Sequence, residues 1–342
     1  MSERRARRAR QVGTGVIGLL ISAVAIAALV TIIDVQATAE ALGRTDLWLL
    51  AATLLLVPGQ VILRTLRWWL LVPVRADGGR PSSLRVLPVL LVGYLANLIL
   101  PARLGEPARA YLLARRERLG FASVLGSVLL ERVIDLATLA AVAIWAALRA
   151  DAPEWIVRGM VVVAVIGLAL VVALVASGIP RAVALVGRAI GTRADRVRVA
   201  MDQATSFGHG ARGGGWARLG SAVLLSTITW AFVAATYWLV ARSLGLEIGV
   251  SASMLVAAVS TLGSAIPSAP ANIGTFEVAA VVVLTALEVP PHEALAMALL
   301  VHAVVTVPFA ITGAAAVGWM SISLAAVAEE AAAAMPAAPA EG

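Results

Sequence analysis

The chain of 342 residues contains neither cysteine nor lysine, and only 14% of its residues are charged. The absence of cysteine excludes disulfides and thiolate metal sites. Apolar residues make up 61% of the sequence, and the mean hydropathy is +0.93. A soluble core does not need so much apolar surface. The bulk of the chain is therefore expected to lie in a lipid bilayer.

Several motifs of catalytic and nucleotide-binding proteins are also absent. The sequence contains no nucleophile elbow, Walker loop, dinucleotide fingerprint or HExxH motif. His209 and His302 do not have the spacing of a metal site. We therefore predict that the protein is not an enzyme, has no cofactor or metal, and on this chain alone is not an ATP-driven pump. The net charge of +7 indicates arginine-rich loops beside anionic lipid rather than nucleic-acid binding.

Six stretches are long and apolar enough to span a bilayer, which takes about 20 residues. They are 13–33, 47–72, 120–148, 155–177, 217–243 and 293–320. Two further apolar stretches, 86–100 and 250–289, are too short or are broken by proline. The sequence therefore predicts an all-α fold, a polytopic helical membrane bundle of six full spans plus two re-entrant broken elements.

Clusters of arginine set the predicted orientation. They lie at 1–12, 73–85, 101–119 and 178–218. The positive-inside rule puts all four in the cytoplasm, which requires 86–100 to enter and leave on the cytoplasmic side. Both termini are then cytoplasmic, whereas 250–289 can be either a re-entrant pair or two full spans. The predicted organisation is a basic cytoplasmic N-terminus at 1–12, a transmembrane domain at 13–320 and a disordered C-terminal tail at 321–342.

The two halves of the chain, about 13–148 and 155–320, have the same predicted order of elements. Each consists of two spans, a broken element and a final span, and the halves start on opposite sides of the membrane. Inverted repeats with broken helices are typical of transporters, whose binding site lies near the midplane. The chain has only two asparagines, Asn97 and Asn272, and each broken element contains one. We therefore predict an inverted repeat.

Three charged residues, Glu131, Arg132 and Asp135, lie in the middle of an apolar stretch. Glu131 and Asp135 are four residues apart and share a helix face. An unpaired charge at that depth costs about 2.5 kcal/mol or more, so these side chains must face the interior and have partners. The candidate partners are Arg64, Arg67, Arg103 and Arg109. Two interpretations stand: a structural clamp, or a polar site for a charged substrate.

Arg64 and Arg67 lie near the cytoplasmic end of the second span, beside Trp68 and Trp69. Long cationic side chains in this position commonly extend to the membrane surface, and tryptophans gather there. The pattern therefore favours snorkelling arginines over members of a buried site.

The first broken element ends in charged residues and contains Asn97. Arg103 and Arg109 can form forked hydrogen bonds to a phosphate, and Gly105 allows the backbone to approach a ligand. Glu106 can orient Arg109 or pair with a cationic headgroup. The start of the following helix also favours anions. We predict a hydrated tip with phosphate-binding geometry.

The second broken element supplies Asn272, Gly274 and Glu277 from the opposite face of the membrane. A headgroup could pass between the two half-sites. His302 lies in the last span, where a hydrogen-bonded core residue is favoured over a proton relay.

These motifs together resemble a known family. They are Asn97, Pro101-x-Arg103-x-Gly105-Glu106-x-x-Arg109, Glu131-Arg132-x-x-Asp135 and Pro267-x-x-Pro270-x-x-x-Gly274-x-x-Glu277. Over roughly 13–320 the sequence resembles the transmembrane region of lysylphosphatidylglycerol synthase, also called the flippase-like integral membrane domain. The resemblance implies an eight-element bundle that moves or binds phospholipids or polyprenyl-linked sugars in the cytoplasmic membrane. Ala271-Asn272 departs from the more glycine-rich turn expected there.

Larger members of that family carry an aminoacyl-tRNA-dependent transferase domain after the bundle, and the present sequence has no such domain. The resemblance therefore does not imply lipid aminoacylation. Two functions remain: a translocator of an anionic membrane lipid or lipid-linked sugar, and a non-transporting scaffold or regulator of an envelope-biosynthesis enzyme. An integral membrane transferase is a distant third alternative. The inverted repeat and the midplane charges favour the translocator.

Overall fold

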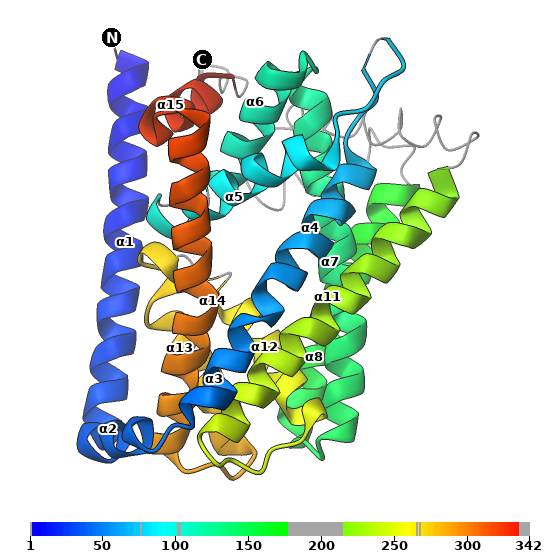
Figure 1. The fold of residues 1–342 in the computed structure, drawn as a ribbon. Coiled ribbons are helices and arrows are strands. Elements are labelled where there is room, and N and C mark those ends of the chain that lie inside the picture. Colours follow the sequence, from blue (N-terminus) through cyan, green and yellow to red (C-terminus); the bar gives the residue numbers. More distant parts are fainter. Residues whose placement is uncertain are drawn as a thin grey trace.

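All regular structure in the described residues of the computed structural model is helical (Figure 1). The structure describes residues 2–75, 77–100, 104–176, 215–264, 266 and 268–334. The helices of the first half are α1 (Ser2–Ile32), α2 (Val35–Gly43), α3 (Leu47–Leu54), α4 (Leu56–Leu71), α5 (Ser83–Ile99), α6 (Gly105–Glu117) and α7 (Phe121–Arg149). The second half contains α8 (Glu154–Ala176), α11 (Gly215–Ser243), α12 (Val250–Gly263), η3 (Pro270–Asn272), α13 (Thr275–Ala286), α14 (Pro291–Met320) and α15 (Leu324–Ala334). The all-α fold class is confirmed.

Every stretch predicted to span a bilayer is helical, but fewer than six qualify as full spans. By length and composition, three helical stretches in the described chain could cross a membrane. They are Leu47–Leu71, Ala217–Ser243 and Pro291–Met320. Ile17–Ile32 and Val35–Gly43, bent by 86°, would form a fourth if the pair is one span. The long helix α7 differs from these because three charged residues lie in its middle.

Aspartate caps separate the first helices. Asp34 accepts hydrogen bonds from two backbone N–H groups in the first turn of α2, at 2.9 and 3.0 Å. Asp46 does the same for α3, at 2.8 and 3.2 Å. Such caps satisfy donors that a helix start leaves unpaired. They fix the sharp bend after α1 and the start of the second long helical stretch.

Two pairs of short helices interrupt the long ones: α5 with α6, and α12 with α13; all of these except α6 are apolar. In Figure 1, α5 and α6 lie in the half of the molecule that contains the N-terminus and α15, and α12 and α13 lie in the opposite half. The short helix η3, which lies in the second break between α12 and α13, contacts α5 of the first pair. The order of elements therefore recurs in both halves; re-entrance and an inverted repeat stay predictions.

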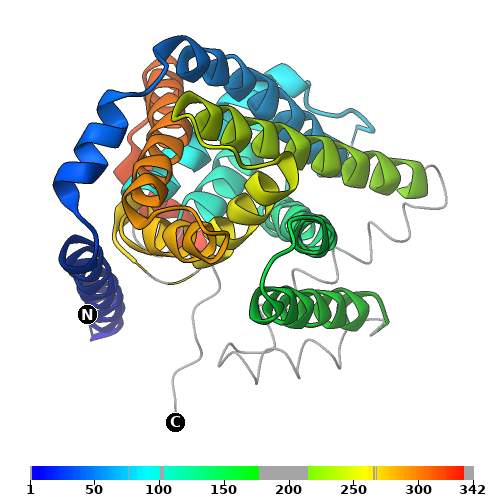
Figure 2. The same cartoon turned by 90° about the horizontal axis from the view of Figure 1, so that it is seen from below.

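The apolar core of the described residues consists of two large clusters and a small third one around Leu71, Ile134 and Ala222. One large cluster is formed mainly by α11, α12, α13 and α14, and the other by α5 and α6 with the ends of α4, α14 and α15. Figure 2 shows α1 and α8 at the outer edge of this arrangement. Gly59 of α4 lies directly against Phe232 of α11, since a Cβ there would be 2.6 Å from that ring. Small residues at crossings let membrane helices pack closely.

The stretch predicted as a disordered tail, 321–342, contains α15. This helix packs against α6, with Val327 and Ala331 buried. Arg115 of α6 pairs with Glu330 of α15 at 2.9 Å. Residues 335–342 lie outside the described residues, as does most of the arginine cluster at 178–218.

Candidate functional site

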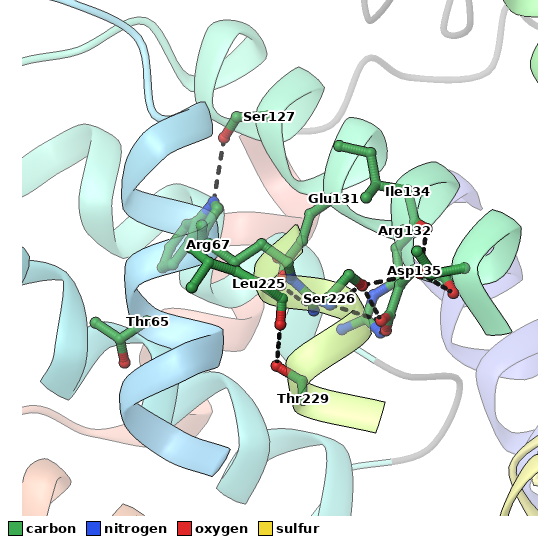
Figure 3. Close-up of polar contacts among 12 residues, drawn as sticks. Thr65, Arg67, Ser127, Glu131, Arg132, Ile134, Asp135, Leu225, Ser226 and Thr229 are labelled. Atoms are coloured by element: carbon green, nitrogen blue, oxygen red, sulfur yellow. Dashed lines mark hydrogen bonds and ion pairs between the residues drawn. The ribbon is translucent and has the colours of Figure 1, made fainter. Parts of the chain in front are cut away.

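Arg67 of α4 joins two carboxylates of α7 (Figure 3). Its Nη2 donates to Glu131 Oε1 at 2.8 Å, and its Nη1 donates to Asp135 Oδ1 at 2.6 Å. The side chains of Arg67 and Glu131 are both 0% exposed. The expectation that Arg67 extends to the membrane surface is therefore wrong. Two carboxylates on a neighbouring helix hold the guanidinium inside the bundle.

A helix of the second half contributes to the same contact. Ser226 of α11 accepts from Arg67 Nη1 at 2.7 Å and donates to Asp135 Oδ1 at 3.1 Å. Thr138 lies 2.9 Å from the same hydroxyl. Buried ions are tolerated where further hydrogen bonds satisfy their remaining atoms. The ion pairs thus connect α4 and α7 with α11.

Arg109 of α6 occupies the other side of Glu131. Its Nη2 donates to Glu131 Oε2 at 2.6 Å, and its side chain is 2% exposed. The guanidinium lies 4.5 Å from the ring centre of Trp68, in cation–π geometry. Trp68 is fixed in turn by a 3.2 Å hydrogen bond from its indole N–H to Ser127. Each oxygen of Glu131 therefore binds a different arginine.

A third arginine extends the contacts toward the surface. Arg132 of α7 pairs with Glu106 of α6 at 2.8 Å and lies 3.7 Å from Asp135. The side chains of Arg132 and Glu106 are 28% and 21% exposed. We call these six residues the arginine–carboxylate network: Arg67, Arg109, Arg132, Glu106, Glu131 and Asp135. It runs from a fully buried centre to a partly exposed edge.

Charges and donors in and around the network are not balanced. Three arginines face three carboxylates, and Arg64 is a further electrostatic partner of Asp135. Arg109 Nη1 and the Tyr94 hydroxyl are buried without a hydrogen-bond partner. Tyr94 interacts electrostatically with Arg67 and packs edge-on against Phe309 of α14. Unpaired buried donors are uncommon and require an explanation. The region has an excess positive charge and free donors.

The turn between α5 and α6 positions Arg109. Asn97 accepts a 2.9 Å hydrogen bond from the backbone N–H of Gly105. A Cβ on Gly105 would lie 2.0 Å from the carbonyl oxygen of Gly93 and 2.5 Å from Asn97 Oδ1. A Cβ on Gly93 would lie 2.9 Å from Arg109. The two helices therefore cross where neither can carry a side chain, and this crossing directs Arg109 inward.

The second break forms a separate polar cluster. Glu277 accepts a 2.7 Å hydrogen bond from the backbone N–H of Gly274, and its other oxygen contacts Nδ1 of His302. Nε2 of His302 lies 3.0 Å from the carbonyl oxygen of Ala271. Ser268 donates to Asn272 Oδ1 at 3.4 Å. His302 is thus a hydrogen-bonded residue of the interior, as the sequence favoured.

The predicted site residues fall into three groups. Glu106, Arg109, Glu131, Arg132 and Asp135 come together in the network. Asn97 and Gly105 shape the turn beside it, and Arg103 lies outside the described residues. Asn272, Gly274 and Glu277 belong to the second cluster.

Sequence reasoning did not assign several residues of these clusters to a site. They are Trp68, Tyr94, Ser226 and His302. The sequence indicates Arg67 only as one of four candidate partners for the charges of α7. Those mid-helix charges, two carboxylates and one arginine, sum to −1, so a cation from another helix is required, but the sequence does not single out which one.

The described residues form only helices, three helical stretches among them are long and apolar enough to cross a membrane, and ion pairs are buried between helices, as is typical of a polytopic membrane protein. The family model of the lysylphosphatidylglycerol synthase TM region matches residues 15–313. The chain belongs to this family, and the resemblance drawn from its motifs is confirmed.

Two curated proteins are similar to the chain. The chain is 29% identical to Glycosyltransferase AglD of Haloferax volcanii, over 93% of this chain and 56% of the relative. It is 31% identical to a UPF0104 membrane protein of Methanothermobacter thermautotrophicus, over 44% of this chain and 46% of the relative. The chain thus spans about half the length of the curated relatives it matches.

The first relative contradicts the prediction that the protein is not an enzyme. Nearly the whole chain aligns with a protein named as a glycosyltransferase. The prediction relied on the absence of nucleotide, dinucleotide and metallohydrolase motifs. That absence excludes only the reactions that depend on those motifs, and glycosyl transfer is not among them.

Proposed function

We propose that the protein translocates a lipid with a phosphate-bearing headgroup, either a phospholipid or a polyprenyl-linked sugar, between the leaflets of the cytoplasmic membrane. The observation that carries this proposal is the buried Nη1 of Arg109, which has no hydrogen-bond partner. It lies in a region with one more arginine than carboxylates. Phosphate oxygens are the natural acceptors for such a donor.

The network supports this role by holding Arg109 in one orientation. Glu131 binds its Nη2, and Trp68 lies against its planar face. Because Arg67 binds the other oxygen of Glu131, a phosphate can contact Nη1 without displacing the carboxylate. Glu106 and Arg132 are partly exposed at the edge, where a zwitterionic headgroup could exchange with either partner. In this proposal the guanidinium of Arg103 forms further forked hydrogen bonds to the phosphate.

The two helix pairs supply the path. They lie in opposite halves of the molecule and meet where η3 contacts α5. This arrangement supports an inverted repeat with two re-entrant elements, in which Asn272, Gly274 and Glu277 form the second half-site. Transporters built this way alternate access to a site near the midplane. Both termini are cytoplasmic in this proposal.

A second candidate comes from the relative named Glycosyltransferase AglD. In that case the membrane region binds a lipid-linked sugar and presents it for glycosyl transfer, with or without an envelope-biosynthesis enzyme as partner. The same network would hold the phosphate of the lipid, but the lipid would not change leaflets. A scaffold that regulates such an enzyme is the non-transporting form of this candidate.

The test is lipid translocation in vesicles that contain the purified protein. Fluorescent phosphatidylglycerol and a fluorescent polyprenyl phosphate are compared with a fluorescent glucosylceramide, whose headgroup has no phosphate. We expect faster exchange of the two phosphate-bearing lipids than in protein-free vesicles, and no acceleration of the glucosylceramide. A folded protein that accelerates none of the three would overturn translocation and favour the second candidate.

A further inference from the structure

Both ring nitrogens of His302 face hydrogen-bond acceptors. Nδ1 contacts the carboxylate of Glu277, and Nε2 lies 3.0 Å from the carbonyl oxygen of Ala271. A neutral imidazole carries a proton on only one nitrogen. Next to an ionised carboxylate it could satisfy only one of these contacts, and its lone pair would face the other oxygen.

The observed geometry therefore needs one more proton than a neutral histidine and an ionised glutamate contain. The proton can lie on the imidazole, as an imidazolium beside a carboxylate, or on Glu277, as a carboxylic acid donating to Nδ1. Both forms let His302 donate to Ala271 through Nε2. The number of bound protons is the same in either case.

The pair is shielded and isolated from other charges. Glu277 is 5% exposed, and the ring of Phe276 lies 4.6 Å from that of His302. Residues 17–32 of α1 and all of α12 contain no titratable side chain, and Glu277 is the only one on α13. The other titratable side chains on elements packed against α13 and α14 are Glu40 on α2, Arg85 and Tyr94 on α5, Arg218, Tyr237 and Arg242 on α11, and His292 and Glu293 in the first turn of α14. Among the described residues, no ion pair or hydrogen bond links any of these side chains to the pair.

The proton also controls the shape of the second break. Ala271 and Asn272 both have left-handed backbone angles, with φ of 59° and 61°. Such angles are strained for residues with side chains and persist only where contacts hold them. The contact from His302 to Ala271 is one of these, and it acts directly on η3, which contacts α5. Loss of the proton would release this contact.

We propose that Glu277 and His302 form a proton-binding site, and that release of its proton frees the break at 268–274 to move against α5. This inference rests on the proposed translocation function, in which the proton would be the coupling ion. A purely structural alternative exists, because Glu277 also caps α13 through Gly274. The experiments must separate the two.

Glu277→Gln does so. The glutamine carbonyl can still accept from Gly274, and its amide N–H can donate to Nδ1 of His302. The variant therefore retains the cap and permanently imitates the protonated pair. Glu293→Gln on α14 removes a carboxylate outside the site and serves as the matched control.

The first measurement counts protons and does not depend on transport. The other histidines, His209 and His292, are replaced by asparagine. NMR of labelled imidazole nitrogens and glutamate carboxyls then reports the protonation states of His302 and Glu277. We expect the extra proton to be present on the pair at pH 7. A neutral imidazole beside an ionised Glu277 at pH 7 would overturn the site.

The second measurement follows the break itself. Ile266→Cys introduces the only thiol, at a position that is 50% exposed. The rate at which this thiol reacts with a thiol reagent is corrected for thiol ionisation. We expect the corrected rate to rise with pH when Ile266→Cys is the only change and when it is combined with Glu293→Gln. We expect no rise when it is combined with Glu277→Gln. If the reaction rate depended on pH in the same way in all three chains, Glu277 would serve only as a helix cap and not as part of a proton-binding site.

Coupling is then tested with a pH gradient across the vesicle membrane. One pH unit supports an about tenfold lipid ratio between leaflets for each coupled proton. We expect a gradient-dependent ratio for wild type and Glu293→Gln, and none for Glu277→Gln. If lipid exchange between the leaflets is the same with and without the pH gradient, proton coupling would be overturned, but the proposed translocation would stand. Absence of any exchange would overturn the proposed function, while the NMR and thiol results still decide whether the proton site exists.

Discussion

The guanidinium of Arg67 and the carboxylate of Glu131 lie 2.8 Å apart, and neither side chain is exposed at all. An ion pair in such a place is stabilised by further hydrogen bonds from both partners. Arg67 makes such bonds to Asp135 and Ser226, although its Nε has no hydrogen-bond partner among the described residues. Glu131 makes one with Arg109. The pair therefore fixes α4, α6 and α7 relative to one another.

Replacement of Arg67 should destabilise the bundle strongly. Arg67→Met keeps most of the side-chain volume but leaves Asp135 without its closest cation and Glu131 with one arginine. Removing one partner of a buried pair costs about 3–5 kcal/mol. We expect a clearly lower midpoint in thermal unfolding of the detergent-solubilised protein.

The matched control is Arg158→Met. Arg158 pairs with Glu154 on α8, and their side chains are 72% and 77% exposed. Exposed pairs contribute about 0–1 kcal/mol, so this variant should unfold like the wild type. Equal unfolding of Arg67→Met and Arg158→Met would show that the buried network does not stabilise the fold.

The crossing of α5 and α6 gives a second prediction. In Gly105→Ala the new Cβ would lie 2.0 Å from the backbone oxygen of Gly93, which cannot rotate away. Overpacking of this kind costs about 1–3 kcal/mol or more. We expect reduced thermal stability and displacement of Arg109, whose position depends on this turn.

Gly220→Ala is the control for that change. Gly220 lies in α11, and no atom would be within 4 Å of its Cβ. Alanine favours helix by about 1 kcal/mol over glycine, so this variant should be as stable as the wild type or more so. If Gly105→Ala were as stable to heat as Gly220→Ala, α5 and α6 would not be in close contact at Gly93.

Much of this fold could be predicted from the sequence. Hydrophobic length located the six long helical stretches, and proline with charge located both breaks. The interior position of Glu131 and Asp135 followed from the cost of an unpaired charge in a membrane. These predictions rest on local composition and on one strong energetic rule.

Pairing between distant helices could not be predicted in the same way. Arg67 has the local pattern of a snorkelling residue and is only one of four candidate partners of the α7 charges; the position of α7 beside α4 singles it out. The tail at 321–342 has the composition of a disordered segment, yet α15 forms because Val327 and Ala331 find an apolar surface on α6 and the end of α14. Tertiary contacts decide both cases.

The predicted orientation can be tested with single thiols, since the chain has no cysteine. Arg115 and Glu154 are 66% and 77% exposed, and α6 and the start of α8 lie at opposite ends of the molecule in Figure 1. We expect an impermeant thiol reagent to label Glu154→Cys in intact cells, and Arg115→Cys only after permeabilisation. Labelling of Arg115→Cys from outside would contradict the re-entrant first element.

Arg109→Lys tests whether the network binds a substrate or only stabilises the fold. Lysine keeps the positive charge beside Glu131 and the contact with Trp68, so the variant should fold with little loss of thermal stability. It cannot present two separate amino groups in a plane, one to Glu131 and one to a phosphate. A hydrogen bond to a charged group contributes about 1.5–3 kcal/mol, so translocation of phosphate-bearing lipid should fall about tenfold or more. Arg158→Lys, on the exposed face of α8, is the control at equal protein amounts and should translocate at the wild-type rate. Equal rates for both variants would remove Arg109 from the substrate site and leave the network as a structural clamp.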